Sequence, residues 1–147
     1  MPREDGEGPH DKVTFNHAMR LRRDGEHAEA VEAFRAALKI APDDGPAWLC
    51  LGASLAEIGE DAEAADAFGR ACALCPTWEL ASVCRFHRLK WLGRGQEAQA
   101  EAQRFIDLVK AGAARFSHRD HLDAFAMWSV EEDPDALARE IIRHRRS

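Results

Sequence analysis

Cysteine and histidine side chains recur at short intervals between residues 72 and 87. Cys72 and Cys75 are separated by two residues, and Cys84 and His87 repeat the same gap. Thiolate and imidazole ligands with this spacing are typical of tetrahedral zinc sites. One hypothesis is therefore a metal-binding or catalytic accessory domain that uses these four residues.

A second group with chemical potential is His118, Arg119 and Asp120, which follow the order of a kinase catalytic-loop triplet. The sequence holds neither a glycine-rich phosphate loop nor an Asp-Phe-Gly segment, so we interpret the triplet as chance. His118 and His121 share one helical face and would bind a metal ion weakly, but a first helical turn at the surface accounts for both. Since the sequence shows no set of nucleophile and base, we predict no enzymatic activity, no cofactor and no metal.

The elements that carry these residues repeat with a period of 34 residues. Residues 11–44 align with residues 45–78 without a gap, and the likeness runs the length of the repeat. The identities pair Leu21 with Leu55, Gly25 with Gly59, Glu26 with Glu60, Ala28 with Ala62, Glu29 with Glu63, Ala30 with Ala64, Ala33 with Ala67, Phe34 with Phe68, Ala37 with Ala71 and Pro42 with Pro76. Self-similarity at a fixed period indicates a solenoid, whose usual product is a binding surface.

Each repeat is predicted to form two antiparallel helices. Two apolar-periodic stretches flank Gly25, Gly59 or Gly93, and glycine can take the left-handed conformation that ends a helix. Pro42 and Pro76 then stop the second helix. Small residues stand where the paired helices cross, namely Ala30, Ala64 and Ala98. A pair this small cannot bury its apolar stripe alone, so consecutive pairs must stack.

The second repeat carries a known family pattern. Its residues at the patterned positions are Trp48, Leu51, Gly52, Leu55, Ala64, Phe68 and Pro76. This pattern resembles the tetratricopeptide repeat, apart from Leu55, where the family usually has an aromatic residue. The resemblance implies an all-α fold, a right-handed solenoid of three helix hairpins at residues 11–44, 45–78 and 79–112. The residues after the third hairpin predict two C-terminal capping helices at residues 113–147.

The two ends of the chain differ from the repeats. Residues 1–10 are glycine-rich, acidic and without periodicity, which predicts a disordered lead. Ser117 and Asp120 form a capping box for a helix to about Val130. Asp133 and Pro134 then begin another helix, and its apolar face is supplied by Leu137, Ile141 and Ile142.

Composition limits the partners of the chain. Of its 147 residues 46% are hydrophobic, and the net charge of -6 disfavours nucleic acid. No apolar run approaches the roughly 20 residues that cross a bilayer, and the first residues lack a signal-peptide apolar stretch, so we expect no membrane contact and a cytoplasmic protein. The four cysteines are interpreted as reduced thiols that pack as small core residues.

The family resemblance places binding on a concave groove lined by the first helix of each pair. The implied groove residues are Phe15, Asn16, Met19, Arg22, Arg23, Leu49, Ala53, Glu57, Val83, His87, Lys90 and Trp91. The floor of this groove is apolar and its rim is basic at Arg22, Arg23 and Lys90. We therefore expect a protein–protein interaction module, a scaffold, adaptor or small chaperone, that binds an apolar or amphipathic partner segment with acidic flanks.

Alternatives to this groove stay open. Phe15, Met19 and Trp91 could be core residues, with the basic groups forming an ordinary solvated surface. The C-terminal helix that bears Leu122, Phe125, Met127 and Trp128 could also fold back and fill the groove. The two-carboxylate clamp of some tetratricopeptide cochaperones is rejected because Phe15, Met19 and Cys50 stand at its Lys and Asn positions. Small three-repeat chaperones of bacterial secretion systems are a closer analogy in architecture.

Overall fold

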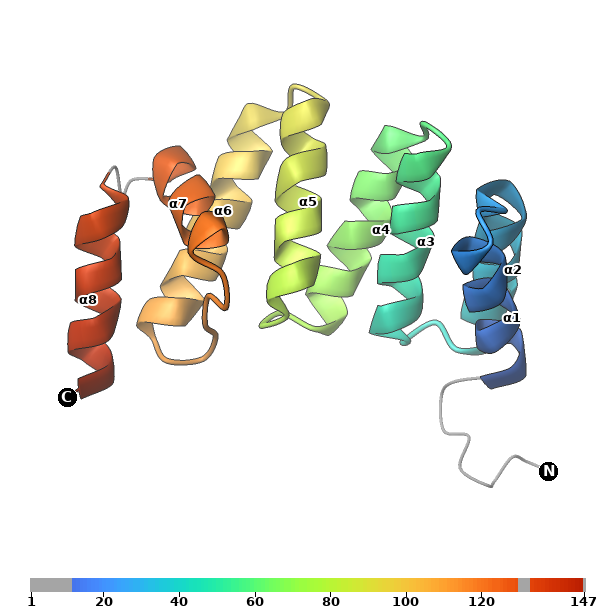
Figure 1. Ribbon diagram of the computed structural model, residues 1–147, viewed down its shortest axis with the longest axis horizontal. Coiled ribbons are helices and arrows are strands. Elements are labelled where there is room, and N and C mark those ends of the chain that lie inside the picture. Colours follow the sequence, from blue (N-terminus) through green and yellow to red (C-terminus); the bar gives the residue numbers. More distant parts are fainter. Residues whose placement is uncertain (1–11, 130–132, 147) are drawn as a thin grey trace. The chain divides into compact units, whose positions relative to one another are not determined.

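The structure, a computed structural model, describes residues 12–129 and 133–146. Within those ranges the chain forms eight α-helices and no β-strand, which confirms the all-α class (Figure 1). The helices are α1 (Lys12–Arg23), α2 (His27–Ile40), α3 (Gly45–Glu57), α4 (Asp61–Leu74), α5 (Glu79–Trp91), α6 (Gly95–Lys110), α7 (Arg119–Trp128) and α8 (Pro134–Arg146). None of these helices has the length and apolar character needed to cross a membrane. The lead at residues 1–10 lies outside the described residues.

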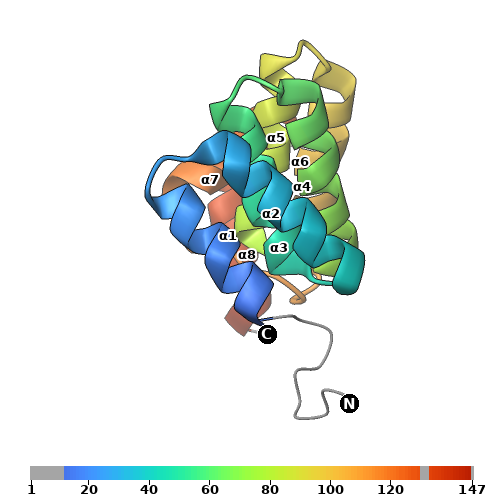
Figure 2. The ribbon, with the colours of Figure 1, turned by 90° about the vertical axis from the view of Figure 1, so that its right-hand side faces the viewer.

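The helices group into two compact units. Unit 1 holds α1 to α4 and ends at Cys75, and unit 2 begins at Pro76 and holds α5 to α8. In unit 1, α1 packs on α2, α2 on α3 and α3 on α4. Figure 2 shows α1 and α2 lying side by side. In unit 2, α5 packs on α6, and α7 packs on both α6 and α8. Within each unit, consecutive helices are thus neighbours in space, as helix pairs require.

The same turn joins the two helices of each of the first three pairs. Gly25, Gly59 and Gly93 have φ angles of 82°, 84° and 75°, which confirms the left-handed conformation expected from the sequence. The residue after each glycine donates its backbone N–H to the carbonyl five residues earlier, at 2.8, 2.9 and 2.9 Å. Because these bonds close the last turn of the first helix, the chain reverses within a few residues and the second helix lies antiparallel.

Close packing within the pairs follows from the small residues. Ala30, Ala64 and Ala98 are all fully buried, as their place at the helix crossing predicts. Phe68 in α4 lies directly over Gly52 in α3, where a Cβ atom would stand only 2.6 Å from Cε1 of the ring. The phenylalanine therefore fills the space that a glycine leaves open on the facing helix.

Replacing Gly52 with alanine should destabilise unit 1 by about 1–3 kcal/mol, since the methyl group forces the Phe68 ring out of its place. Urea denaturation followed by circular dichroism measures the change. Gly95→Ala in unit 2 is the matched control, because its Cβ would meet Trp128 at an ordinary 3.5 Å. Equal unfolding midpoints for the two variants would contradict the close approach at Gly52.

The helix expected to start at a Ser117 cap begins later than predicted. α7 starts at Arg119, and its N-cap is His118, whose side chain makes no capping hydrogen bond. The capping box is wrong because Ser117 has another role: its backbone N–H donates to Oε1 of Glu79 at 2.9 Å. The helix ends at Trp128, and Val130 lies outside the described residues.

The start of α8 agrees with the sequence. Oδ1 of Asp133 accepts the backbone N–H of Asp135 at 3.0 Å, which confirms Asp133 as the cap before Pro134. Leu137 and Ile141 are buried as expected, whereas Ile142 is half exposed and does not join the buried face.

An aromatic cluster holds α7 in unit 2. The ring of Phe125 lies 4.6 Å from Phe86 in α5 and 6.0 Å from Phe105 in α6, measured between centroids. Phe116, in the loop before α7, lies 5.7 Å from Phe125. The apolar face of α7 is thus used against α5 and α6, while Met127 on the same helix is 72% exposed.

Candidate functional site

In unit 1 the groove-side residues of α1 and α3 form a mixed surface over a packed core. Phe15 is half-buried and meets the buried Phe34 edge-on at 6.0 Å, and Leu49 is only 9% exposed. Partial burial raises the pKa of Cys50, and the nearby Arg22 guanidinium acts in the opposite direction. Arg22 of α1 therefore lies close to Cys50 of α3, at the junction of the two first helices.

Arg22 also has an unused hydrogen-bond donor. Its Nε is buried and has no hydrogen-bond partner among the described residues. A buried donor without an acceptor costs about 1–3 kcal/mol. This position is therefore a local cost to the packing of unit 1.

In unit 2 the groove side of α5 presents exposed apolar and basic groups together. Leu80 is 48% exposed and Trp91 is 74% exposed, while His87 between them also reaches the surface. Lys90 stands over two aromatic rings, with Nζ 5.0 Å from the centroid of Phe86 and 5.2 Å from that of Trp128. The ammonium group is therefore held in place over the Phe86 and Trp128 rings.

The His87 imidazole is held in its neutral form. Partial burial is the main cause that lowers the pKa of His87, and the neighbouring charges of Lys90, His121 and Arg88 lower this pKa further. Near neutral pH the cations of this face are thus the lysine and arginine side chains rather than His87.

The twelve groove residues inferred from the family resemblance differ in exposure. Eight belong to unit 1 and four to unit 2. Leu49 and Val83 are buried, so they contribute to the core rather than to an open floor. The half-buried residues are Phe15, Met19, Arg22, Ala53 and Lys90, and the exposed ones are Asn16, Arg23, Glu57, His87 and Trp91.

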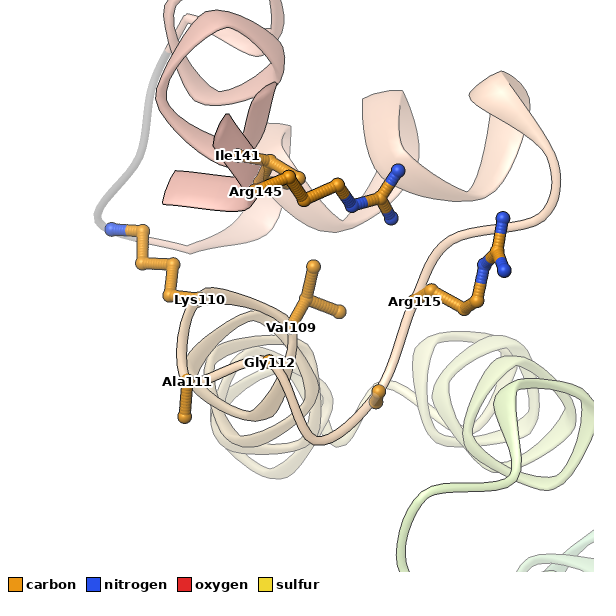
Figure 3. Close-up of a pocket in the computed structure, with 8 residues that line it drawn as sticks. Val109, Lys110, Ala111, Gly112, Arg115, Ile141 and Arg145 are labelled. Carbon is orange, nitrogen blue, oxygen red and sulfur yellow. The ribbon is translucent and has the colours of Figure 1, made fainter. Parts of the chain in front are cut away.

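A basic pocket near the end of the chain was not found by sequence reasoning. It has a volume of ≈ 400 Å³ and is lined by residues of α6, the following loop and α8. Figure 3 shows the Arg115 and Arg145 guanidinium groups on one side of this pocket and Lys110 on the other. Lys110 lies 3.5 Å from the Glu140 carboxylate. The only sequence signal for this pocket was a set of isolated cations separated by some 30 residues.

The cysteine and histidine set is divided between the units. Cys72 and Cys75 belong to unit 1, and Cys84 and His87 belong to unit 2. Cys72 is buried in α4, and Sγ of Cys75 lies against Gly45, so close that a Cβ atom there would meet it at 2.6 Å. Both thiols of the first pair thus pack against neighbouring residues of unit 1.

A different group of metal-binding side chains lies in unit 2. Glu79, His118 and His121 each offer one ligand atom, and these atoms lie within 4.8 Å of one another. Glu79 is partly buried, which acts to raise its pKa, but hydrogen bonds from His121 and Ser117 outweigh this effect and the pKa is lowered. The sequence showed the two histidines as a surface pair but did not connect them with Glu79.

Comparison with known proteins identifies the repeat. Residues 13–54 match the family described as tetratricopeptide repeat. No curated protein matches the chain by sequence.

Solved structures share the fold over most of the chain. MamA from Desulfovibrio magneticus RS-1 is similar with a TM-score of 0.65 and 17% identity, over 98% of this chain and 77% of that one. A chain of the CopN–Scc3 complex has a TM-score of 0.62 and 16% identity, over 91% and 68% of the two chains. The Thermobaculum terrenum O-GlcNAc transferase has a TM-score of 0.65 and 23% identity, over 99% of this chain but 27% of that one.

At 16–23% identity these neighbours show the fold alone, and the repeat match at residues 13–54 favours a protein–protein interaction module. The comparisons supply no positive indication of catalysis, since this chain covers little of the transferase. The glycine turns, the buried alanines and the matched residues 13–54 agree with one another, so the chain resembles tetratricopeptide repeat proteins in fold, and the family match itself covers residues 13–54.

Proposed function

We propose that this protein binds an amphipathic segment of a partner protein that carries acidic residues beside an apolar anchor. The observation that carries the proposal is Trp91, a large aromatic side chain that is 74% exposed on the groove side of α5. Trp and Arg are the residue types that most often dominate binding energy at interfaces. An exposed indole on a helix that also carries a fixed ammonium group, that of Lys90, is therefore a suitable anchor point.

Charge supports the choice of an acidic segment. Arg88 and Lys90 lie in the last turn of α5, next to Trp91, and Arg20, Arg22 and Arg23 lie in the last turn of α1. Carboxylates of the partner would pair with cations of this kind. Each unit thus offers its own contact set, apolar and basic in unit 2 and mainly basic in unit 1.

The proposal includes the finer role of a scaffold, adaptor or small chaperone, with no catalytic step. Support for a protein partner comes from the repeat family and from the similar chain of the CopN–Scc3 complex. We also propose a cytoplasmic location, because the four cysteines are buried or half-buried in helices or at a helix end, and a reducing compartment suits thiols that pack in this way.

A peptide-display selection on the immobilised full chain tests this proposal. Selected peptides should carry an apolar residue with Asp or Glu neighbours, and their affinity should fall as salt is raised. Trp91→Ala should weaken binding by about 30-fold, the effect of losing a contact of about 2 kcal/mol. Lys90→Gln should reduce both the affinity and its salt dependence.

The matched control is Met127→Ala, which removes an equally exposed apolar side chain of unit 2 from α7. Binding should be unchanged in this variant. Selected peptides without acidic residues, or equal losses in the Trp91 and Met127 variants, would contradict the proposed site.

A further inference from the structure

We propose that Glu79, His118 and His121 bind a divalent transition-metal ion, with Zn²⁺ as the expected species. This site is separate from the proposed peptide-binding residues and from the Cys72 to His87 set. Its three ligand atoms lie within 4.8 Å of one another, and the side chains line a pocket of ≈ 390 Å³ in unit 2.

The backbone brings residues 39 or more positions apart to this point. Glu79 is the first residue of α5, while His118 is the N-cap of α7 and His121 lies in its first turn. The three-residue spacing places both imidazoles on one side of the helix, with ring centroids 4.9 Å apart. The site therefore links the starts of two helices within unit 2.

Hydrogen bonds already orient the carboxylate. Oε1 of Glu79 accepts the Ser117 N–H at 2.9 Å, and Oε2 lies 2.7 Å from Nδ1 of His121. Ligand atoms on a tetrahedral zinc ion lie roughly 3.3 Å apart, given bonds of about 2.0–2.2 Å. The ion would replace the shared proton between Oε2 and Nδ1 after a small rotation of the side chains. The Ser117 N–H would remain as the outer partner that fixes the carboxylate.

The types of donor select the metal. Two imidazoles and one carboxylate suit zinc and its first-row neighbours, whereas magnesium and calcium prefer oxygen ligands alone. Three protein ligands leave a fourth position open toward the pocket. Arg115 lines the same pocket, so an anion such as chloride or a carboxylate would fit the fourth position beside its guanidinium group.

A structural hydrogen bond between Glu79 and His121 is the competing interpretation, and it leaves His118 unexplained. The His118 side chain is exposed and makes no capping hydrogen bond, although it occupies the N-cap. Asp, Asn, Ser and Thr are the residues that favour this position. The His118 imidazole lies within ligand distance of Glu79 and His121. Metal binding would therefore give this imidazole a role that capping does not.

Cobalt titration of the full chain, after treatment with a chelator, tests the site. One equivalent of Co²⁺ should bind and produce weak visible bands without a thiolate charge-transfer band. One equivalent of Zn²⁺ should displace the cobalt and raise the thermal midpoint, while excess Mg²⁺ should not. A thiolate band would assign the metal to cysteines and overturn the proposal, as would the absence of stoichiometric binding.

Variants complete the experiment. His118→Ala should weaken Zn²⁺ binding more than about 100-fold, since the loss of even an outer partner of a ligand costs about 10- to 100-fold. Because His118 is exposed, this variant keeps the fold, as circular dichroism would verify, even if Glu79→Gln does not. His17→Ala, an exposed histidine of α1, is the control and should bind zinc normally. Equal affinities of the His118 and His17 variants would overturn the proposal.

Discussion

Replacing Glu101 with alanine should lower the free energy of unfolding of unit 2 by about 3 kcal/mol. Glu101 in α6 is only 2% exposed, and its carboxylate accepts three side-chain donors. Ser82 Oγ lies at 2.6 Å, Arg85 Nη1 at 2.9 Å and Arg104 Nη2 at 2.6 Å. Removing the carboxylate leaves the buried Ser82 hydroxyl without this acceptor and two guanidinium groups without their anion.

The expected loss of free energy of unfolding is at the low end of the range for breaking a buried ion pair. Arg85 and Arg104 are partly exposed, so water can solvate their guanidinium groups in the variant. Glu101→Gln should lose less, since the amide oxygen still accepts one bond. Urea denaturation in a Trp48→Phe background isolates the signal, because Trp78, Trp91 and Trp128 then report on unit 2 alone.

Glu97→Ala is the matched control for this prediction. It removes the same side chain from the same helix, one turn earlier, where Glu97 forms an exposed pair with Arg94. Water screens that pair, so its loss should change stability little. If the Glu101 and Glu97 variants unfold at the same urea concentration, the buried network makes no net contribution.

The helix pairs could be predicted because their signals are local and repeated. Gly25, Gly59 and Gly93 mark the turns through a backbone preference that does not depend on tertiary context, and the 34-residue period fixes the register. Asp133 and Pro134 gave the start of α8 for the same reason. Interactions within a few residues are readable from a single sequence.

Long-range polar contacts could not be predicted in this way. Glu101 reads as a surface residue of a charged helix, and its burial depends on Ser82 and Arg85, which lie 16 or more residues earlier. Glu79 meets His121 across 42 positions, and this contact also displaced the expected cap at Ser117. When a carboxylate binds a residue far away in the sequence, the sequence contains no periodic pattern that would reveal the contact.

The sequence predicts a binding face but not how exposed each of its residues is. The repeat register assigns Leu49 and Trp91 to equivalent faces of α3 and α5, yet Leu49 is 9% exposed and Trp91 is 74% exposed. Burial depends on what the neighbouring helices place over each position, which the period alone does not specify. Trp91 is therefore proposed as the anchor because of its exposure in the structure. The repeat register only limits which residues can lie on the candidate face.

Replacing Phe86 with alanine should cost unit 2 about 3–5 kcal/mol, the range for truncating a fully buried aromatic side chain. Its ring lies edge-on to Phe125 at 4.6 Å and to Trp128 at 5.9 Å, and Lys90 Nζ stands over it at 5.0 Å. The variant thus loses the ring contacts that hold α7 on α5 and leaves a cavity beside Phe125 and Trp128. Thermal and urea unfolding measure the loss.

Phe86→Leu separates stability from binding. Leucine keeps most of the buried volume, so the fold should survive with a cost of about 1–2 kcal/mol, but Lys90 loses an aromatic face worth about 0.5–1 kcal/mol. Peptide affinity should then fall about two- to fivefold, because the Lys90 ammonium group that pairs with the partner's carboxylates is less fixed. Unchanged affinity in a folded Phe86→Leu protein would show that the placement of Lys90 over the Phe86 ring does not matter for binding, and the indole alone would remain as the anchor.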